Sequence, residues 1–283
     1  MEKNYRAEIT GVFGDPVDGN PTGVMEEAAY AAKGLNYRYI TLKVTKEDFP
    51  DAMKSIKALN MKGMNLTMPH KITVLSYLDE LSEAAGIIGA VNTIVVREDG
   101  SLFGENTDGK GFVQALKNAG ESLTSKKVTI LGAGGAAKAI AVECALAGAS
   151  KITIVNRTES KALELADVVS ENTGTETEAV KWEGTYIVKD TDILINATSI
   201  GFAPDVNVKP DIDYSSITEN MAVTDVVFNP VETVFLKECE KQGAKVINGL
   251  GMLACQGALN FTLWTGVEAP LDVMEETLRK EFE

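Results

Sequence analysis

The chain has 283 residues, and its 27 Lys and Arg stand against 41 Asp and Glu, which gives a net charge of −14. This balance argues against a nucleic-acid partner, because such binding needs clustered cations to neutralise phosphates. Histidine occurs once, at His70, so HExxH motifs, multi-histidine metal centres and triads that need a second histidine are excluded. We therefore expect no metal site, and chemistry that relies on Lys, Asp, Glu, Tyr or a bound cofactor.

Composition also indicates the compartment and the class of protein. Hydrophobic residues make up 45% of the chain and charged residues 24%, which is typical of a globular protein with one large or two modest domains. Cys144, Cys239 and Cys255 are far apart in apolar stretches and are predicted to be buried thiols. The first ten residues lack a signal-peptide layout, and the apolar stretch 139–149 is too short for a membrane span. We expect a cytoplasmic protein, and the sequence leaves a homodimer open.

The first part of the chain alternates β-rich runs with helical ones. Strands are expected at residues 7–14, 38–44 and 63–68, each followed by a helix. Residues 90–97 and 101–104 flank Glu98, Asp99 and Gly100, a sequence that favours the turn of a β-hairpin.

From about residue 127 the alternation becomes stricter. Further strands are expected at residues 127–131, 151–155, 192–196, 223–228 and 245–248, and helices at 135–146, 159–170 and 231–242. Strands that alternate with helices indicate parallel βαβ units. In a last helix over 271–283, Leu271, Met274, Leu278 and Phe282 share one face. The sequence therefore predicts an α/β protein, with a change of domain near residues 105–125.

A glycine-rich turn directly follows the strand at 127–131. Its sequence, GAGGAA at 132–137, has the G-x-G-x-x-G/A spacing of dinucleotide-binding turns. Gly132 would allow the tight turn, Gly134 would let the backbone approach a pyrophosphate, and Ala137 would permit close packing of helix on strand. The N–H groups at the helix start would bind the anion. A glycine-rich turn without a ligand is the alternative, which the flanking strand and helix disfavour.

The end of the next strand indicates the cofactor. An NAD site usually has Asp or Glu there to bind the ribose hydroxyl, but this chain has Asn156, Arg157 and Thr158, with Lys161 one turn on. Arg157 and Lys161 would attract a 2′-phosphate. We therefore predict NADP as the cofactor, with NAD left open. The alternative is that Arg157 is a solvated surface charge, and the nearby Glu159 weakens the preference for NADP.

Several blocks, taken in order, resemble the shikimate/quinate dehydrogenase family over almost the whole chain. They are residues 14–16 (Gly-Asp-Pro), 65–71 (NLTMPHK), 89–93 (GAVNT), 106–109 (NTDG), 132–137 (GAGGAA), 156–158 (NRT), 196–199 (NATS) and 248–252 (NGLGM), followed by Gln256. The resemblance implies an N-terminal α/β substrate domain, residues 1–107 plus 251–283, with the C-terminal helix returning to it. Residues 108–250 would form a Rossmann-like NADP-binding domain, and the active site would lie in the cleft between the two.

The resemblance also implies an activity and its residues. The family oxidises or forms a secondary ring alcohol, as in shikimate and 3-dehydroshikimate, with NADP as the hydride carrier. Lys71 would be the acid/base and Asp108 would orient it, although a salt bridge that joins two loops would have the same sequence. By resemblance, Asn92 and Gln256 would bind ring hydroxyls, Asn65 and Thr67 would shape the same wall, and a structural role of Asn65 stays open. The cofactor site would comprise Gly132, Gly134, Gly135, Ala136, Ala137, Asn156, Arg157, Thr158, Lys161, Thr198 and Gly249.

The chain departs from the family where the substrate carboxylate is bound. The two serines that bind it in the family are replaced by Asn20 and Thr22, and a tyrosine by Phe228, which cannot donate a hydrogen bond. The family's His-Asn pair is Glu26-Glu27. Either the substrate differs at its acid end (quinate, a modified shikimate, or a polyol without the carboxylate), or Asn20 and Thr22 still bind shikimate.

Two other classes of protein remain as alternatives. One is a ligand sensor on the same fold with weak or no activity, which the retained Lys71 and Asp108 disfavour. The other is a different Rossmann enzyme, such as a relative of methylene-tetrahydrofolate dehydrogenase, which the NTDG and NGLGM blocks disfavour. His70 is expected to lie in an extended segment and to point away from its neighbour Lys71, toward a wall or the surface.

Overall fold

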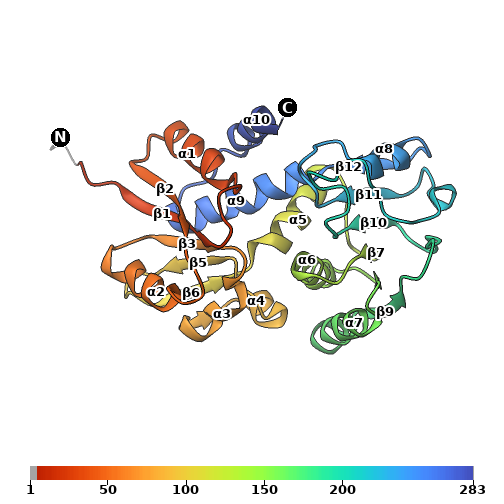
Figure 1. Cartoon of the computed structure of the whole chain (residues 1–283), viewed down its shortest axis with the longest axis horizontal. Coiled ribbons are helices and arrows are strands. Elements are labelled where there is room, and N and C mark those ends of the chain that lie inside the picture. The colour runs from red at the N-terminus through yellow and green to blue at the C-terminus, as the bar shows by residue number, and fades with distance from the viewer. Residues whose placement is uncertain (1–4, 283) are drawn as a thin grey trace. The chain divides into compact units, whose positions relative to one another are not determined.

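The computed structural model describes residues 5–282 and divides the chain into two compact units. Unit 1 comprises residues 1–107 and 256–281, and unit 2 comprises residues 108–255 and 282–283. Of the segments interpreted above, residues 1–4 and Glu283 lie outside the described residues. Figure 1 labels most of the elements of both units.

Unit 1 contains a six-stranded sheet in the order β2-β1-β3-β5-β6-β4. Its strands are β1 (Glu8–Gly14), β2 (Tyr37–Lys43), β3 (Gly63–Leu66), β4 (Glu80–Leu81), β5 (Thr93–Val96) and β6 (Leu102–Glu105). The strand β1 is parallel to β2 and β3, whereas β5 is antiparallel to β3 and β6. The mixed sheet thus joins a βαβ half to a hairpin half.

The helices of unit 1 follow the strands, as the alternation predicts. They are α1 (Thr22–Ala32), α2 (Phe49–Ala58), α3 (His70–Thr73) with the 3₁₀ turn Val74–Tyr77, and α4 (Glu83–Ile88). In the core, the side chains of Phe13, Ile56 and Met64 are at most 1% exposed. Burial of such large apolar side chains contributes on the order of 2 kcal/mol each.

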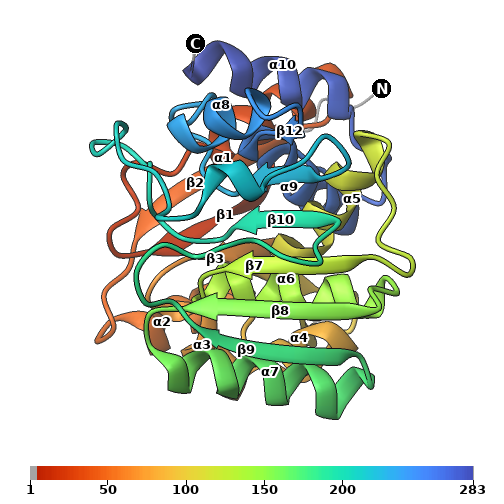
Figure 2. The same ribbon diagram turned by 90° about the vertical axis from the view of Figure 1, so that its right-hand side faces the viewer.

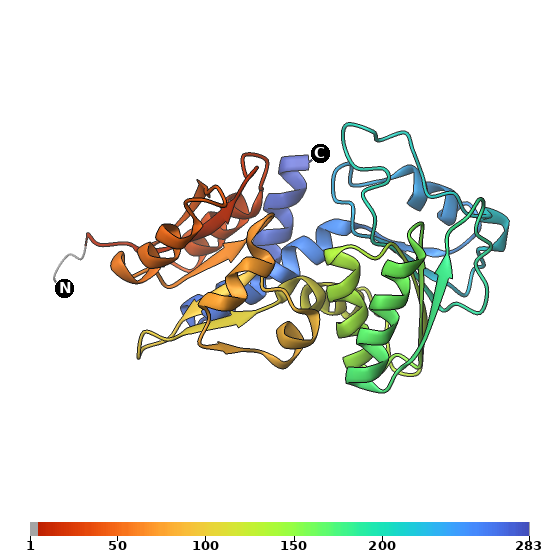
Figure 3. The ribbon, with the colours of Figure 1, turned by 60° about the horizontal axis from the view of Figure 1, so that its bottom comes forward.

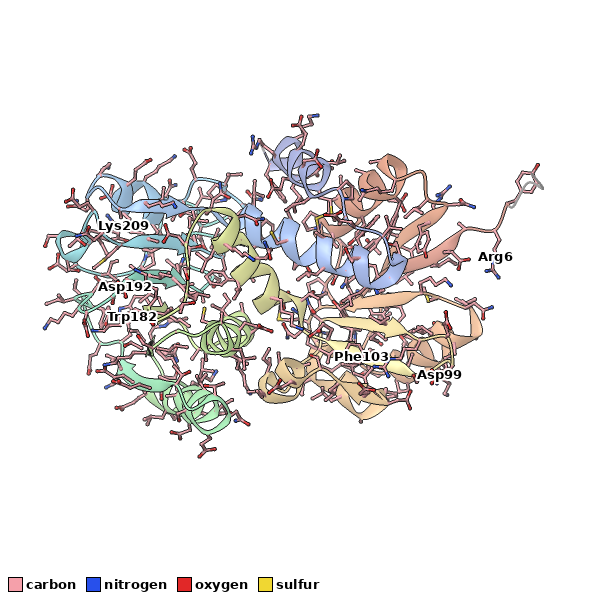
Figure 4. The ribbon with its side chains drawn as sticks, turned by 180° about the vertical axis from the view of Figure 1, so that it is seen from behind. Arg6, Asp99, Phe103, Trp182, Asp192 and Lys209 are labelled. Atoms are coloured by element: carbon pink, nitrogen blue, oxygen red, sulfur yellow. The ribbon has the colours of Figure 1, made fainter. Side chains whose placement is uncertain are left out.

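The β5–β6 hairpin confirms the predicted turn. Val96 faces Leu102 in the antiparallel register, and Gly100 has φ +81°, a conformation that glycine adopts without steric cost. The Asp99 carboxylate, labelled in Figure 4, accepts hydrogen bonds from the backbone N–H and the hydroxyl of Ser101. The turn chemistry of three consecutive residues therefore fixes this hairpin locally.

Unit 2 contains a six-stranded, fully parallel sheet in the order β12-β11-β10-β7-β8-β9. Its strands are β7 (Lys127–Leu131), β8 (Lys151–Asn156), β9 (Glu176–Lys181), β10 (Ile193–Asn196), β11 (Ala222–Asp225) and β12 (Lys245–Ile247). The order changes direction at β7, and ligands of open parallel sheets bind outside the carboxyl ends of the strands at such a point. Figure 2 shows β7, β8, β9 and β10 side by side.

The remaining helices complete the chain. They are α5 (Thr107–Asn118), α6 (Gly135–Leu146), α7 (Glu159–Thr173), the 3₁₀ turn Tyr214–Ser216, α8 (Val234–Glu240), α9 (Gly249–Thr265) and α10 (Leu271–Phe282). Helices α6 and α7 pack against each other and against β8 (Figures 2 and 3). The α/β fold class and the buried state of the three cysteines are confirmed.

Some element boundaries differ from the prediction. The strand expected at 223–228 ends at Asp225, because the Asp225 side chain accepts a hydrogen bond from the Val227 N–H and turns the chain out of the sheet. The helix expected at 231–242 spans only Val234–Glu240, because the Thr233 hydroxyl caps it by accepting from the Leu236 N–H. The sequence interpretation did not identify α5, β9 or α9.

Candidate active site

The glycine turn of unit 2 leaves the start of α6 open. Gly132 has φ +109°, and a Cβ there would lie 2.9 Å from the Ala197 carbonyl oxygen, so only glycine fits. At Gly134 and Gly135 an added Cβ would meet nothing within 4 Å, so the backbone there is accessible. Ala137 is fully buried, and Ala136 beside it is half-buried. This arrangement can hold a phosphate on the N–H groups of the first turn of α6.

The carboxyl end of β8 carries exposed cations. Asn156 closes a local turn by donating from Nδ2 to the Thr158 carbonyl at 2.9 Å. Arg157, Thr158 and Lys161 are exposed at the start of α7. Glu159 is exposed in the same turn, so the local field is mixed. In this fold the end of the second strand lies at the ribose of a bound dinucleotide. These side chains can therefore hold a phosphate on that ribose.

A buried carboxylate joins two loops at the ends of β10 and β11. Asp225 Oδ1 accepts from Asn196 Nδ2 and the Val227 N–H, each at 3.0 Å, and Oδ2 accepts from the Thr233 hydroxyl at 2.7 Å. Asn196 Oδ1 in turn accepts from the Thr198 hydroxyl at 2.6 Å. Burial raises the pKa of Asp225 to about 6, although these three hydrogen bonds oppose the shift. Asp225 therefore fixes the segment that carries Thr198.

The loop after β11 carries Phe228 and packs against Gly249, the first residue of α9. A Cβ at Gly249 would lie 2.5 Å from the Val227 carbonyl oxygen, so close packing alone requires glycine there. The Phe228 ring packs edge-on against Phe202 with centroids 5.3 Å apart, and against Phe282 at the same distance. Phe228 thus belongs to an aromatic cluster and offers no hydrogen-bond donor.

The predicted catalytic residues each lie in the first turn of a helix, α3 or α5. Lys71 is in α3, half-buried, and its carbonyl accepts from the Val91 N–H at 2.8 Å. Asp108 is half-buried in the first turn of α5, where the helix N-terminus stabilises a negative charge. Lys71 belongs to unit 1 and Asp108 is the first residue of unit 2, so their pairing stays a prediction.

The predicted substrate residues of unit 1 meet in one buried cluster. We define the amide–hydroxyl network as Asn65, Asn92, Thr93, Thr107, Gln256 and Asn260, all at most 8% exposed. Asn65 donates from Nδ2 to the Asn92 carbonyl and the Thr93 hydroxyl, and its Oδ1 accepts from the Tyr39 hydroxyl and Asn260. All four positions of the Asn65 amide are therefore used by the protein. This favours the structural role that the sequence left open for Asn65.

Asn20 and Thr22, the predicted carboxylate-binding residues, lie just before α1 and at its first position. Asn20 Oδ1 accepts from the Thr22 N–H at 3.0 Å, which leaves its Nδ2 as a donor for a ligand. Thr22 is buried at the start of α1. Thr67 is half-buried after β3, and its N–H donates to the Phe13 carbonyl. Thr67 thus lies in the segment between β3 and α3.

Glu26 lies one turn beyond Thr22 on the buried face of α1. It is fully buried, and neither carboxyl oxygen has a hydrogen-bond partner among residues 5–282. Burial raises the pKa of Glu26 well above its ordinary value, and the nearby Tyr30 hydroxyl offsets only part of this effect. Glu27, in contrast, accepts the Tyr39 N–H and ties α1 to β2. Unit 1 thus encloses one carboxyl group, Glu26, without a hydrogen-bond partner among the described residues.

His70 corrects one prediction. It lies in the helix α3 and not in an extended segment, and it is buried at 1% exposure and not at the surface. Its ring stacks on Phe49 with centroids 4.3 Å apart, and Nε2 lies 2.7 Å from the Val44 carbonyl. The lone histidine of the chain therefore packs within unit 1, between Phe49 and the end of β2.

Sequence reasoning missed four residues that the structure brings to these sites: Tyr39, Thr93, Asn260 and Asp225. Asn260 lies one helical turn after Gln256, which is the only local signal for it. Tyr39, Thr93 and Asp225 have no local signal, because their hydrogen-bond partners come from distant parts of the chain.

Among residues 5–282, no group of three or more His, Cys, Asp or Glu is placed to hold a metal ion. The described helices also include none that is long and apolar enough to cross a membrane.

A parallel sheet with a glycine turn between β7 and α6 defines unit 2 as a Rossmann-type dinucleotide-binding domain. Three family models match the chain. The shikimate dehydrogenase substrate binding domain matches residues 12–94, shikimate / quinate 5-dehydrogenase matches residues 114–203, and the shikimate 5'-dehydrogenase C-terminal domain matches residues 249–279.

Similar proteins agree with these matches. Shikimate dehydrogenase (NADP(+)) of Desulforamulus reducens is 42% identical, over 98% of this chain and 97% of the relative. Among solved structures, the 5-ketofructose reductase of Gluconobacter sp. strain CHM43 has a TM-score of 0.95 at 46% identity, over 99% of this chain and all of the other. A shikimate dehydrogenase in complex with NADP+ has a TM-score of 0.92 at 40% identity, over 99% of this chain and 97% of the other.

The chain therefore belongs to the shikimate dehydrogenase family, whose members are oxidoreductases that act on CH–OH groups. This confirms the resemblance and the two-part α/β architecture expected from the sequence.

Proposed function

We propose that the chain is an NADP-dependent oxidoreductase in which unit 2 binds the cofactor and unit 1 binds the substrate. NADP would accept or supply the hydride. The turn at Gly132 to Ala137 would hold the pyrophosphate on the N–H groups of α6. Arg157 and Lys161, exposed at the end of β8, would hold the 2′-phosphate. The similar shikimate dehydrogenases, one named for NADP(+) and one solved in complex with NADP+, support this assignment.

For the proton that accompanies the hydride, we propose Lys71 and Asp108. A secondary alcohol must lose its hydroxyl proton as the hydride leaves its carbon, and a ketone must gain one in the reverse direction. Lys71 would exchange this proton, and Asp108 would hold the ammonium group and the substrate hydroxyl in line. Both side chains are half-buried, and both residues belong to the blocks that resemble the family, 65–71 and 106–109.

For the substrate, we propose an uncharged polyhydroxylated ketone, reduced to its alcohol. The observation that carries this is the loss of the carboxylate-binding groups. Phe228 is held in an aromatic cluster and offers no donor, and buried Glu26 adds a further acid group one turn from Thr22. A carboxylate needs several N–H or O–H donors, whereas a sugar ketone needs a mixture of donors and acceptors. 5-Ketofructose, in the name of the structure at 46% identity, is such a compound.

Shikimate is the second candidate, because curated relatives at 42% identity and nearly full coverage carry that name. Thr22 and the Nδ2 of Asn20 would then bind its carboxylate. The experiment that decides is the NADPH-dependent reduction of 5-ketofructose and of 3-dehydroshikimate by the same preparation. We expect kcat/KM to be at least tenfold higher for 5-ketofructose. A preference for 3-dehydroshikimate would contradict the proposed substrate, and turnover of neither would favour a ligand sensor.

A variant with Phe228→Tyr sharpens this comparison. It restores one hydroxyl donor at the carboxylate end and leaves the ring volume nearly unchanged. We expect it to raise kcat/KM for 3-dehydroshikimate at least tenfold, since a hydrogen bond to a charged acceptor contributes about 1.5–3 kcal/mol. Phe202→Tyr, a change in the same aromatic cluster, is the matched control. An equal gain in both variants would show that Phe228 has no specific relation to the acid end.

The cofactor preference gives a separate prediction. In Arg157→Ala/Lys161→Ala, we expect KM for NADPH to rise about 10- to 100-fold, while KM for NADH changes less than threefold. The reason is that only NADPH carries the 2′-phosphate that these cations would neutralise. Steady-state kinetics with both cofactors measure this, with Lys189→Ala, an exposed lysine that precedes β10, as the control. Equal loss with NADPH and NADH would contradict the assignment of the two cations.

A further inference from the structure

The polarity of the amide–hydroxyl network can be worked out from one fixed point, the Asn92 carbonyl. This oxygen only accepts, so the Asn65 atom that lies 3.1 Å from it must be the nitrogen. The other amide atom of Asn65 is then Oδ1, which accepts the Tyr39 hydroxyl at 2.8 Å. Asn65 is thereby fixed in one orientation, with its oxygen toward α9.

The orientation of Asn65 determines that of Asn260. The Asn260 atom that faces Asn65 Oδ1, at 3.4 Å, must be Nδ2, because two amide oxygens would repel each other. Asn260 Oδ1 then lies toward the hydroxyls of Thr93 and Thr107, each at 2.8 Å. Both hydroxyls can donate there, since Thr93 accepts from Asn65 Nδ2 and Thr107 accepts from Asn92 Nδ2. All these hydrogen bonds are consistent with a single assignment.

The same rule extends to Gln256, one turn earlier on α9. Asn260 Nδ2 lies 3.2 Å from the Gln256 amide, so the Gln256 atom at this contact must be the oxygen. The Nε2 of Gln256 therefore points away from Asn260, and it has no hydrogen-bond partner among residues 5–282. Gln256 is 8% exposed, whereas Asn260 is fully buried.

We infer that Asn260 is a positioning residue that orients the Gln256 amide so that it offers N–H donors to the substrate. This inference rests on the proposed function, in which unit 1 binds the substrate and Gln256 contacts it. The consequence for specificity is that the wall at Gln256 recognises an acceptor oxygen, such as a carbonyl or the lone pair of a hydroxyl. Because Asn65 is saturated by the protein, Gln256 and not Asn65 supplies this contact.

The first test is Asn260→Leu, which removes the donor and keeps the branched shape and the number of heavy atoms of the side chain. We expect KM for the ketone to rise about tenfold, a typical effect of losing an oriented hydrogen bond. The kcat value should stay within threefold and KM for NADPH should not change, because the contact forms equally in the ground and transition states. Thr262→Val removes another side-chain hydrogen bond of α9 outside the network and is the control. An unchanged KM in a folded Asn260→Leu protein would overturn the inference.

Two further variants test the polarity and the coupling. Gln256→Glu keeps an oxygen toward Asn260 Nδ2 but places an acceptor where we infer an N–H, so KM should rise at least tenfold. If Gln256 offered its carbonyl to the substrate, this variant would bind within about twofold of wild type, which would overturn the inference. In addition, Asn260→Leu/Gln256→Ala should be no worse than Gln256→Ala, since the first residue acts through the second. If the increases in KM of the two single variants multiplied in the double variant, the action of Asn260 through Gln256 would be contradicted.

A measurement without substrate separates this inference from the proposed function. The side-chain ¹H–¹⁵N resonances of Gln256 in the ligand-free protein are identified by their loss in Gln256→Ala. They should shift in Asn260→Leu and stay in place in Thr262→Val. Unshifted resonances in Asn260→Leu would overturn the orientation by Asn260, whatever the activity. Absence of turnover by wild type on either ketone would instead overturn the proposed function and leave the spectrum to decide the orientation.

Discussion

Lys71→Ala is expected to lower kcat by about 10²- to 10⁴-fold, the range in which a positioned general acid or base contributes to a rate. The reason is that ketone reduction needs a proton at the nascent alkoxide, and we propose that the Lys71 ammonium group supplies it. KM for the substrate and for NADPH should change much less, because the proton moves only in the transition state. Asp108→Asn should produce a loss of similar direction, since it would leave the ammonium group without its orienting carboxylate.

Stopped-flow or steady-state NADPH oxidation, followed by absorbance, measures this effect. Lys54→Ala is a suitable control, because Lys54 is exposed on α2 and pairs only with Asp51, 2.7 Å away. The competing interpretation is a salt bridge that joins two loops. It predicts that Lys71→Ala lowers the unfolding temperature but leaves kcat within about threefold of wild type, and that result would remove Lys71 from the proposed mechanism.

The second large effect concerns the stability of unit 2 and its pH dependence. The pKa of Asp225 is about 6 in the folded protein against an ordinary value of 3.8, because burial disfavours its charged form. Between these two values the folded state binds more protons than the unfolded state, so the contribution of Asp225 to stability falls as pH rises from about 4 to about 6. The shift of about two units corresponds to about 3 kcal/mol.

Asp225→Asn isolates this contribution. Its Oδ1 can keep the two N–H donors, and its Nδ2 can donate to the Thr233 hydroxyl, so the variant should preserve the loop. Urea unfolding of both proteins at pH 4 and pH 7 gives the measurement. We expect the variant to gain about 3 kcal/mol relative to wild type between these pH values. Parallel pH profiles would show that Asp225 titrates as an ordinary aspartate.

Some of the fold could be predicted because its signals are local. The hairpin turn at Asp99 and Gly100, the glycine turn before α6 and the apolar stripe of α10 each depend on residues within a few positions of one another. The helix α9 was missed for the opposite reason. It is apolar around most of its circumference, and the helical period that marks a surface helix is absent from such a segment. The strand β9 alternates mostly polar residues at the edge of its sheet, which also gives little signal.

The end of β11 shows how one side chain overrides an apolar pattern. Residues 223–228 favour a longer strand, but the Asp225 carboxylate binds the Val227 N–H and ends the ladder. Asp225 can do so because Asn196 and Thr233 hold it from two other segments. No window of sequence around Asp225 contains that information, so the boundary was out of reach of pattern-based prediction.

The sequence by itself determined the class of chemistry open to this protein. With one histidine and a net charge of −14, it excluded several enzyme classes, and its ordered motifs identified the family. Tertiary structure decided which polar atoms remain for a ligand. Asn65 and Asn260 lie 195 residues apart in the chain, and Thr93 and Asn260 lie 167 apart, yet they share hydrogen bonds. A hydrogen bond uses up a donor and an acceptor wherever they come from, so only the folded chain reveals that Asn65 is saturated and that Gln256 is oriented.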